Sequence, residues 1–442
     1  MAAVLGGCTV KQINPEGRLE KRQLTIQAVP EEQDDPETRT MRNDKGKVYW
    51  CKGDRISLFY GKGTDGGSVF TSTQEEDTVK VTNFTGTIGV ITGGADITEE
   101  DTYFWGLYPY NESASCDGSS ITTTLSPTQT AFAGSYATGT QISLGRSQGL
   151  IMGFYNVTGG FRFTVNKEGV RKATFRGNNG EKLAGTLKVS FVSGKPSTEV
   201  VDGVEEIVLE APVGEYFEVG KYYYFVMAPA AFANGFTVKA ETYTEETTFE
   251  YSKSVTVAPS GFMSKTNMDK DLTWTQKTGN IPVEDANFKA YLVENFDTDK
   301  DGEVSYAEAA AITTIRTYMD GIESVQGIEY MQNLDTLCHF GSKPAGLLTK
   351  LDVSNNTELV TLYCYSNQLM SLDVSKNTAL TSLDCSPMAV NDNNVLETLY
   401  IYDGQTINWI TENRNGNYIP AATEIVVRAE SGGNDDNKDT EL

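Results

Sequence analysis

Two hydrophobic patterns divide this chain into a β-rich part and a repeat part. Between residues 46 and 274, short runs rich in Val, Ile, Thr, Tyr and Phe alternate with breaks of Gly, Asn and Asp, as in residues 55–60 and 222–226. This spacing is typical of β-sandwiches rather than of a parallel sheet. Because the region is long for a single sandwich, we expect two lobes, over residues 46–157 and 158–274.

The second pattern is a repeat of leucines in the last third of the chain. Leu351 recurs as Leu372, 21 residues later, and the residues that follow each leucine match as well. The stretch 359–369 (LVTLYCYSNQL) fits the leucine-rich-repeat consensus, with Asn367 at its asparagine position. Leucines of such repeats stack inward, because one repeat cannot bury its own apolar face, and the asparagine satisfies backbone groups at the turn. We therefore predict a leucine-rich-repeat solenoid over residues 316–428.

The twelve residues 297–308 (DTDKDGEVSYAE) carry the most specific chemical motif of the chain. Side-chain oxygens fall at loop positions 1, 3, 5, 9 and 12, Gly302 is at position 6, and the residue at position 7 contributes its carbonyl. This is the calcium-loop pattern of an EF-hand, in which alternate side chains fold around a cation that needs six to eight oxygens. The predicted Ca²⁺ ligands are Asp297, Asp299, Asp301, Glu303, Ser305 and Glu308.

Helices are expected on both sides of this loop. Apolar residues at Phe288, Leu292 and Phe296 share one helical face before it, and Ser305 and Glu308 form a capping box that starts a second helix after it. A simpler interpretation is that the acids only cap this helix and form a polar turn, but a capping box does not explain three alternating aspartates. We expect a linker at 275–282 and an EF-hand-like unit at 283–315. One loop without a second favours a structural calcium clamp over a switch.

Charge and composition narrow the classes of function. The chain has 442 residues and a net charge of −24, so a nucleic-acid partner is not expected, because phosphate binding needs clustered Lys and Arg. The single histidine, His339, is interpreted as an ordinary core or surface residue. Nothing in the sequence requires an enzyme, although a pair of catalytic carboxylates stays open as an alternative.

The six cysteines show no spacing typical of zinc sites. Cys364 and Cys385 occupy equivalent repeat positions and are expected to be buried. A disulfide between Cys51 and Cys116 is left open.

The two ends of the chain are polar, apart from the first eight residues. Residues 1–8 (MAAVLGGC) resemble the end of a bacterial lipoprotein signal, which would place a lipid anchor on Cys8; either the true start lies upstream or the match is chance. Residues 9–45 are expected to form an exposed tether or a first strand followed by a flexible loop. Residues 429–442 are acidic and predict a disordered tail.

A series of residues in the β-rich part resembles a known family. In order along the chain these are Thr38, Arg39, Thr40, Trp50, Gly53, Asp54, Ile56, Phe59, Tyr108, Pro109, Tyr110, Leu125, Gln129, Leu183, Ala184, Gly185, Ala228, Pro229, Phe232, Gly235 and Phe236. Taken together, they resemble the fimbrillin family of Bacteroidetes, over about residues 20–275. The resemblance implies a two-lobed, transthyretin-like β-sandwich lipoprotein that builds or anchors surface fimbriae.

The resemblance also implies a route of assembly. In polymerising members a trypsin-like protease cuts after an arginine near the first strand, and the vacated groove accepts a strand from the next subunit. Arg39 and Arg42 are the candidate processing sites here; alternatively they are two solvated arginines in a loop. A long C-terminal extension departs from the polymerising pattern and would obstruct strand donation, which favours a tip, an anchor or a free-standing adhesin.

These observations predict a multidomain, mainly β, non-catalytic adhesion protein at the cell outer membrane, as a surface lipoprotein or fimbrium. Its expected partners are a protein receptor or other fimbrial subunits, with outward-facing Tyr363, Tyr365, Asp384 and Tyr400 on the repeats. The alternative is a glycan-binding lipoprotein for nutrient uptake, in which Trp105, Trp274 and Trp409 would stack on sugars.

Overall fold

The computed structural model confirms a mainly β, multidomain chain. It describes residues 19–29, 41–42, 48–60, 62–63, 67–76, 79–91, 103–137, 139–212, 214–317, 321–339, 348–385, 396–405, 408–409 and 423–428. The chain forms two compact units. The first comprises Met1–Glu241 with Thr247–Thr273, and the second comprises Thr242–Glu246 with Trp274–Leu442.

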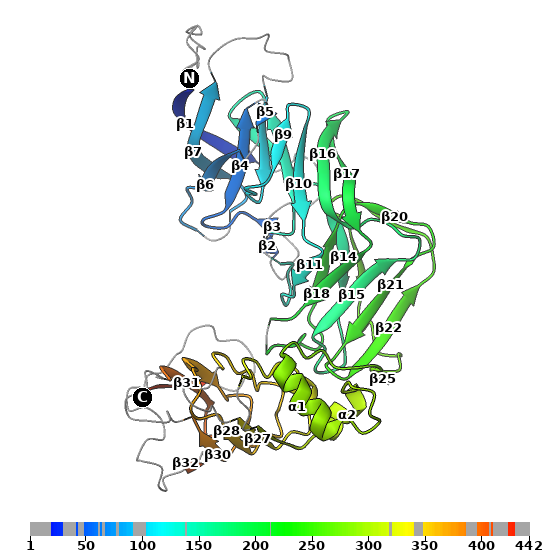
Figure 1. Ribbon diagram of the computed structural model, residues 1–442. Coiled ribbons are helices and arrows are strands. Elements are labelled where there is room, and N and C mark those ends of the chain that lie inside the picture. Colours follow the sequence, from blue (N-terminus) through cyan, green and yellow to red (C-terminus); the bar gives the residue numbers. More distant parts are fainter. Residues whose placement is uncertain are drawn as a thin grey trace. The chain divides into compact units, whose positions relative to one another are not determined.

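The first unit begins with a closed barrel of seven strands (Figure 1). Its order is β1 (Leu19–Val29), β13 (Ile151–Asn156), β12 (Ser143–Ser147), β8 (Phe104–Tyr108), β4 (Arg55–Tyr60), β6 (Ser68–Ser72) and β7 (Thr82–Ile91). We expected two separate facing sheets here. The sheet closes instead because β1 has a partner on each edge: it pairs antiparallel with β7 and parallel with β13.

The barrel is filled by an aromatic cluster around Trp50. The indole is 1% exposed, and its ring meets those of Phe84, Tyr108 and Phe154 edge to face, with centroids 5.1 to 5.4 Å apart. Such contacts add to the free energy gained by burying the rings. The Trp50 of the family-like series is therefore a core residue.

Further sheets complete the first unit. One has the order β17 (Lys195–Val204), β16 (Ala184–Val192), β10 (Ser120–Leu125), β9 (Ser115–Asp117) and β5 (Lys62–Gly63). Another has the order β11 (Thr128–Thr130), β18 (Glu206–Glu210), β15 (Lys172–Gly177), β21 (Phe236–Glu241) and β22 (Glu245–Tyr251). Smaller sheets pair β19 (Tyr223–Met227), β14 (Gly159–Phe163) and β24 (Phe262–Lys265), then β2 (Met41–Arg42) with β3 (Val48–Tyr49), and β20 (Ala230–Phe232) with β23 (Val255–Val257).

Phenylalanine rings join the sheets that contain β14 and β15. Phe161 of β14 lies 5.8 Å from Phe175 of β15, measured between ring centroids, and Phe175 lies 4.8 Å from Phe236 of β21. All three side chains are buried. The two sheets therefore share one apolar core, as expected for strands with alternating buried positions.

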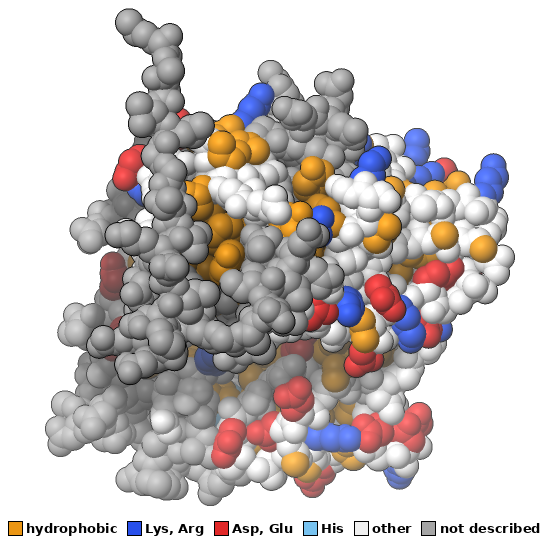
Figure 2. All heavy atoms as spheres, turned by 90° about the horizontal axis from the view of Figure 1, so that it is seen from above, with side chains coloured by type: hydrophobic (Ala, Val, Ile, Leu, Met, Phe, Trp, Pro, Cys, Tyr) orange, Lys and Arg blue, Asp and Glu red, His pale blue; other side chains and the backbone are white. Residues whose placement is uncertain are grey.

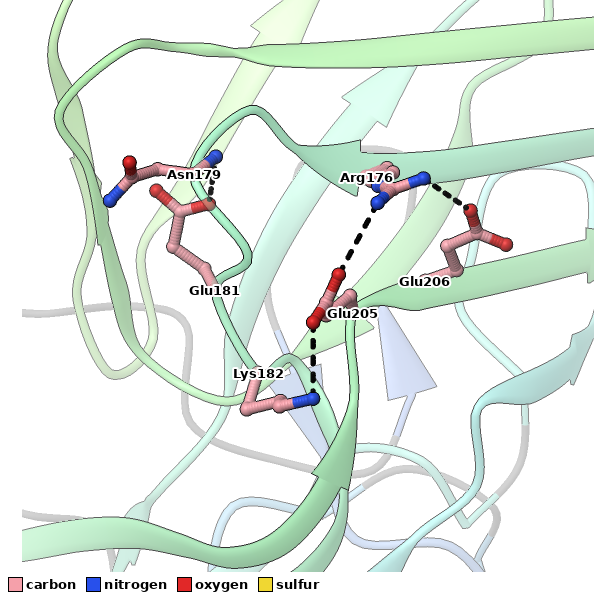
Figure 3. Close-up of polar contacts among 6 residues, drawn as sticks. All are labelled: Arg176, Asn179, Glu181, Lys182, Glu205 and Glu206. Atoms are coloured by element: carbon pink, nitrogen blue, oxygen red, sulfur yellow. Dashed lines mark hydrogen bonds and ion pairs between the residues drawn. The ribbon is translucent and has the colours of Figure 1, made fainter.

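The turn after β15 is bordered by ion pairs (Figure 3). Arg176 contacts Glu205 at 3.3 Å and Glu206 at 3.4 Å, and Lys182 contacts Glu205 at 3.2 Å. These side chains are about a third to a half exposed, so water screens the pairs and each contributes little to stability. On the face drawn in Figure 2, acidic and basic side chains are interspersed over the described residues.

The second unit starts with short elements around the predicted calcium loop. β25 (Thr275–Gln276) pairs with Glu245 and Glu246, and the helices are α1 (Ala286–Phe296) and α2 (Tyr306–Ala311), followed later by the 3₁₀ turn η2 (Ile328–Tyr330). No helix in the described ranges is long and apolar enough to cross a membrane.

Two parallel sheets form the rest of the second unit (Figure 1). The first has the order β26 (Thr314–Thr317), β27 (Thr336–His339), β28 (Thr361–Tyr363), β30 (Ser382–Asp384) and β32 (Asn408–Trp409). The second has the order β29 (Ser371–Asp373), β31 (Thr398–Tyr402) and β33 (Glu424–Arg428). The register places Leu337, Leu362 and Leu383 side by side, and all three are buried.

Candidate functional site

The helix before the acidic loop is fixed by Asp285. Its carboxylate accepts from the N–H groups of Asn287 and Phe288 at the start of α1, and from those of Glu323 and Ser324 in a later segment. Partial burial acts to raise the pKa of Asp285, but these four backbone donors outweigh it and lower that pKa. One side chain therefore both caps α1 and ties it to the chain that enters the repeats.

The loop after α1 brings three predicted ligands together. One carboxylate oxygen each from Asp297, Asp299 and Glu308 lies within 4.8 Å of the others. Gly302 has φ +86°, a left-handed conformation that permits the sharp turn of the loop. The backbone N–H of Gly302 donates to Asp297 at 2.9 Å, which closes the loop on its first residue.

The other three predicted ligands are engaged differently. Asp301 accepts from the N–H of Glu303 at 2.8 Å and is outside the group of three converging carboxylates. The Glu303 side chain pairs with Lys289 at 2.6 Å, so only its carbonyl is left for a ligand role. Ser305 exchanges hydrogen bonds with Glu308 in the predicted capping box.

Glu308 is held in place by four hydrogen bonds. One oxygen accepts from the hydroxyl and the N–H of Thr298 at 2.6 Å, and the other accepts from the N–H and hydroxyl of Ser305 at 2.9 Å. The bonds from Thr298, and then those from Ser305, lower the pKa of Glu308 to about 2. This carboxyl is therefore ionised at neutral pH.

Asp299 shows the electrostatic cost of gathering these acids. The N–H of Asp301 donates to it and acts to lower its pKa. Desolvation, the nearby carboxylates of Asp301 and Glu308, and a hydrogen bond with the Asp297 side chain together outweigh this bond, so the pKa of Asp299 is raised. A set of carboxylate oxygens around a left-handed glycine fits a hard divalent cation, whose charge would offset this repulsion. The capping box accounts for Ser305 and Glu308, whereas the convergence of Asp297 and Asp299 has no role in the cap.

The strands of the first parallel sheet carry a row of side chains in register next to the buried leucines. Arg316, Cys338, Tyr363 and Asp384 lie in register across β26, β27, β28 and β30. The Tyr363 hydroxyl is 3.2 Å from the hydroxyl of Ser382 on the next strand. Of the four residues predicted to face outward, Tyr363 and Asp384 share this sheet and are half-buried. Tyr400 lies on β31 of the other sheet, under the Arg428 guanidinium at 4.3 Å from the ring centroid, and the half-buried Tyr365 follows β28.

Buried asparagines connect neighbouring repeats. Asn367 donates its amide to the carbonyls of His339 and Cys364, which confirms it as a buried residue that satisfies backbone groups. A second pair of buried asparagines, Asn356 and Asn377, was not predicted from the sequence. Asn356 donates to Ile328 and Met331, and Asn377 donates to Val353 and Asn356. Their spacing of 21 residues matches the leucine repeat and was a usable signal in the sequence.

His339 is a core residue at the end of β27. Its side chain is 2% exposed, and Nδ1 contacts the Thr317 hydroxyl of β26. Burial lowers the pKa of His339 from 6.5 to about 4, although Asp285 acts in the opposite direction. The imidazole is therefore neutral and structural at pH 7.

No disulfide joins any of the cysteines in the described ranges. Cys364 and Cys385 are buried, as their repeat positions predict. Cys51 and Cys116 form no disulfide. Burial raises the pKa of Cys116 to about 11, so this thiol is not a reactive nucleophile at neutral pH.

Several predicted functional residues cannot be placed. Cys8 and Arg39 lie outside the described residues, and Arg42 ends β2 with its side chain undescribed. Trp409 is on β32, where only the backbone is described. Trp105 is fully buried and Trp274 is partly buried; a fully buried indole such as Trp105 cannot stack on a sugar.

Comparisons with known proteins found several similar solved structures. No protein-family model matches the sequence, and no curated protein matches it. A solved structure of a candidate cell adhesion protein from Bacteroides ovatus is 10% identical, with a TM-score of 0.33, over 60% of this chain and 97% of that one. A candidate cell adhesion protein from Bacteroides thetaiotaomicron is 13% identical, with a TM-score of 0.26, over 59% and 98%. The tip fimbrial protein Mfa3 from Porphyromonas gingivalis is 11% identical, with a TM-score of 0.23, over 50% and 78%. At these values the likeness does not establish a shared family or function.

Proposed function

We propose that this chain is a non-catalytic cell-surface adhesion protein that binds a protein receptor or other fimbrial subunits. The proposal is carried by the side chains that follow the buried leucines on the strands of the first parallel sheet. Leu337, Leu362 and Leu383 hold the strands from inside, while Tyr363 and Asp384 present an aromatic ring and a carboxylate outside, in register on adjacent strands. Aromatic residues fixed on a rigid sheet are favourable anchors for a protein partner, because little side-chain entropy is lost on binding.

In this proposal the second unit is a leucine-rich-repeat module stabilised by calcium. Asp297, Asp299 and Glu308 would supply carboxylate oxygens to Ca²⁺, with Asp301, Ser305 and the carbonyl of Glu303 as the remaining ligands. The convergence of three carboxylates and the left-handed Gly302 support this assignment. Bound calcium would neutralise the repulsion within the loop and so hold α1 and α2 in one arrangement.

The first unit would act as a fimbrial tip, an anchor or a free-standing adhesin at the outer membrane. The family-like motifs of its sequence support this role, and Cys8 would carry the lipid anchor. Arg39 and Arg42 lie between β1 and β3, so cleavage at either one would disconnect β1 from the rest of the barrel. Because β1 pairs with both β7 and β13, its loss would expose two strand edges, which is what strand exchange requires.

Adhesion can be tested with beads that carry the whole protein. In calcium-containing buffer, coated beads are expected to be retained on epithelial cells or on a fimbriated bacterial surface, and the double variant Tyr363→Ser/Asp384→Ala is expected to reduce retention several-fold. Lys376→Ala, an exposed position elsewhere on the repeats, is the matched control and should not change retention. Equal retention of all three proteins, or of uncoated beads, would contradict the proposal.

A further inference from the structure

An open hollow of about 450 Å³ is lined entirely by residues of the first unit. Its walls come from the start of β4, the segment after β8, strand β10, and the segment before β12. The lining residues are Arg55, Pro109, Tyr110, Asn111, Glu112, Thr123, Thr124, Gly139 and Ile142. The volume falls in the usual range for small-ligand sites, but the lining is more polar than that of most such sites. A polar ligand therefore suits it better than an apolar one.

The walls of this hollow are held by hydrogen bonds. The N–H of Tyr110 donates to the Arg55 carbonyl at 2.8 Å, and the N–H of Asn111 donates to the Ser57 hydroxyl at 3.1 Å, which fastens this segment to β4. The Asn111 amide then donates to the hydroxyls of Thr123 and Thr124 at 3.1 Å each. Because these groups are already positioned, a ligand would lose little affinity to ordering of the site.

The two charged residues that line the hollow, Arg55 and Glu112, form no ion pair with each other. The Arg55 guanidinium lies over the Tyr110 ring at 5.5 Å from its centroid, and it forms no ion pair with a carboxylate of the described residues. Glu112, which also lines the hollow, likewise has no ion pair among the described residues. An exposed, unpaired arginine is unexpected in a chain with a net charge of −24. Its guanidinium presents several N–H donors, while Glu112 presents only acceptors.

We propose that this hollow binds a saccharide residue. A sugar offers hydroxyls that both donate and accept, which suits the donors of Arg55, the acceptors of Glu112 and the hydroxyls of Thr123 and Thr124. Its C–H surface suits the partly exposed ring of Tyr110. The carboxylate of Glu112 disfavours a phosphate or another densely charged anion at the same place. This inference goes beyond the adhesion proposal, and it depends on neither calcium nor the repeats.

The proposal can be tested on a glycan array that carries neutral oligosaccharides and oligosaccharides containing uronate. Calorimetry then measures the affinity for each glycan that binds the protein. At least one glycan is expected to bind, and Tyr110→Ala and Arg55→Gln should each weaken its binding at least about tenfold. Tyr110→Phe keeps the ring and should bind as the native protein does. Arg162→Gln is the matched control, since Arg162 also stacks on a tyrosine, Tyr222, but lines no part of the hollow.

The two glycan classes separate two roles for Arg55. If the Arg55 guanidinium pairs with a uronate carboxylate, the uronate glycan should bind more tightly than its neutral counterpart, and Arg55→Gln should remove that difference. If Arg55 only donates hydrogen bonds to hydroxyls, the two glycans should bind alike and lose affinity equally in the variant. Three outcomes would overturn the proposal: no glycan is retained, the Tyr110 and Arg55 variants bind like the native protein, or a poly-glutamate peptide binds as well as the best glycan. Melting curves of each variant, recorded alongside, distinguish lost binding from lost folding.

Discussion

Ile281 donates its backbone N–H to the carbonyl oxygen of Val304 at 2.9 Å. Val304 is the eighth residue of the acidic loop and is buried, as is Ile281. The N–H of Tyr306 also donates to the Gly279 carbonyl. Residues 279–281, which precede α1, therefore lie beside residues 304–306 of the acidic loop. In calcium sensors a second loop usually provides such a partner. Here the partner is the linker that precedes α1 in the same chain. Its two hydrogen bonds hold this part of the loop in place without a second loop.

Calcium is expected to stabilise the protein through this loop. At a concentration 100-fold above its dissociation constant, a ligand of the folded state adds about 2.7 kcal/mol to the free energy of unfolding. Glu308→Gln should remove most of this gain, while glutamine at the same position can still complete the capping box with Ser305. The measurement is the melting temperature with calcium and with chelator, for the native protein and the variant. An equal calcium effect in both would show that Glu308 is not a ligand.

The asparagines between repeats are expected to contribute strongly to stability. Asn377→Ala would remove the side-chain donor to the buried carbonyls of Val353 and Asn356, each of which would keep only one backbone N–H donor. Loss of these two buried hydrogen bonds should cost about 1–3 kcal/mol. Asn333 also donates to a carbonyl, that of Ala310, but at an exposed site where water can replace it. Asn333→Ala should therefore cost less than about 1 kcal/mol. Urea unfolding of both variants tests the difference, and similar costs would mean that burial does not decide it.

Local patterns in the sequence predict part of this structure, and long-range pairing decides the rest. Asp297, Asp299 and Glu308 converge as their spacing predicts, because a twelve-residue loop is a local structure. The closure of the barrel by β1 depends on strands far along the chain, and no periodicity within Leu19–Val29 specifies them. The hollow beside Arg55 is hidden for the same reason, since Tyr110 reaches it from 55 positions away.

The role of Asn356 and Asn377 was not predicted for a different reason. Their spacing is visible in the sequence, but the repeat consensus directs attention to Asn367 alone. Only the fold shows that each of them faces the carbonyls of the preceding coil.

Acid is expected to weaken the second unit through His339. The pKa of this histidine is lowered to about 4 in the folded protein, from 6.5, so the unfolded chain binds more protons between these two values. Stability therefore falls as the pH drops from 7 towards 4.5, by roughly 2 kcal/mol from this residue. His339→Gln has no titrating group and should lose that much less over the same range. Urea unfolding at both pH values measures this, and parallel losses in the two proteins would rule out His339 as the cause.

The first strand is expected to be separable from the barrel. A chain that starts at residue 43 lacks β1 and should melt at a lower temperature, because Ile26 and Ala28 no longer fill the core and two strand edges are exposed. A synthetic peptide of residues 19–29 should restore the melting temperature by occupying the same edges.

The Ile26→Asp peptide should fail, since it would bury a carboxylate at a position with no exposed surface. Thr25→Asp is the matched control, because Thr25 points to the opposite, exposed side of the same strand. If neither native nor Thr25→Asp peptide raises the melting temperature, the barrel cannot accept an added strand, and strand exchange in this chain is excluded.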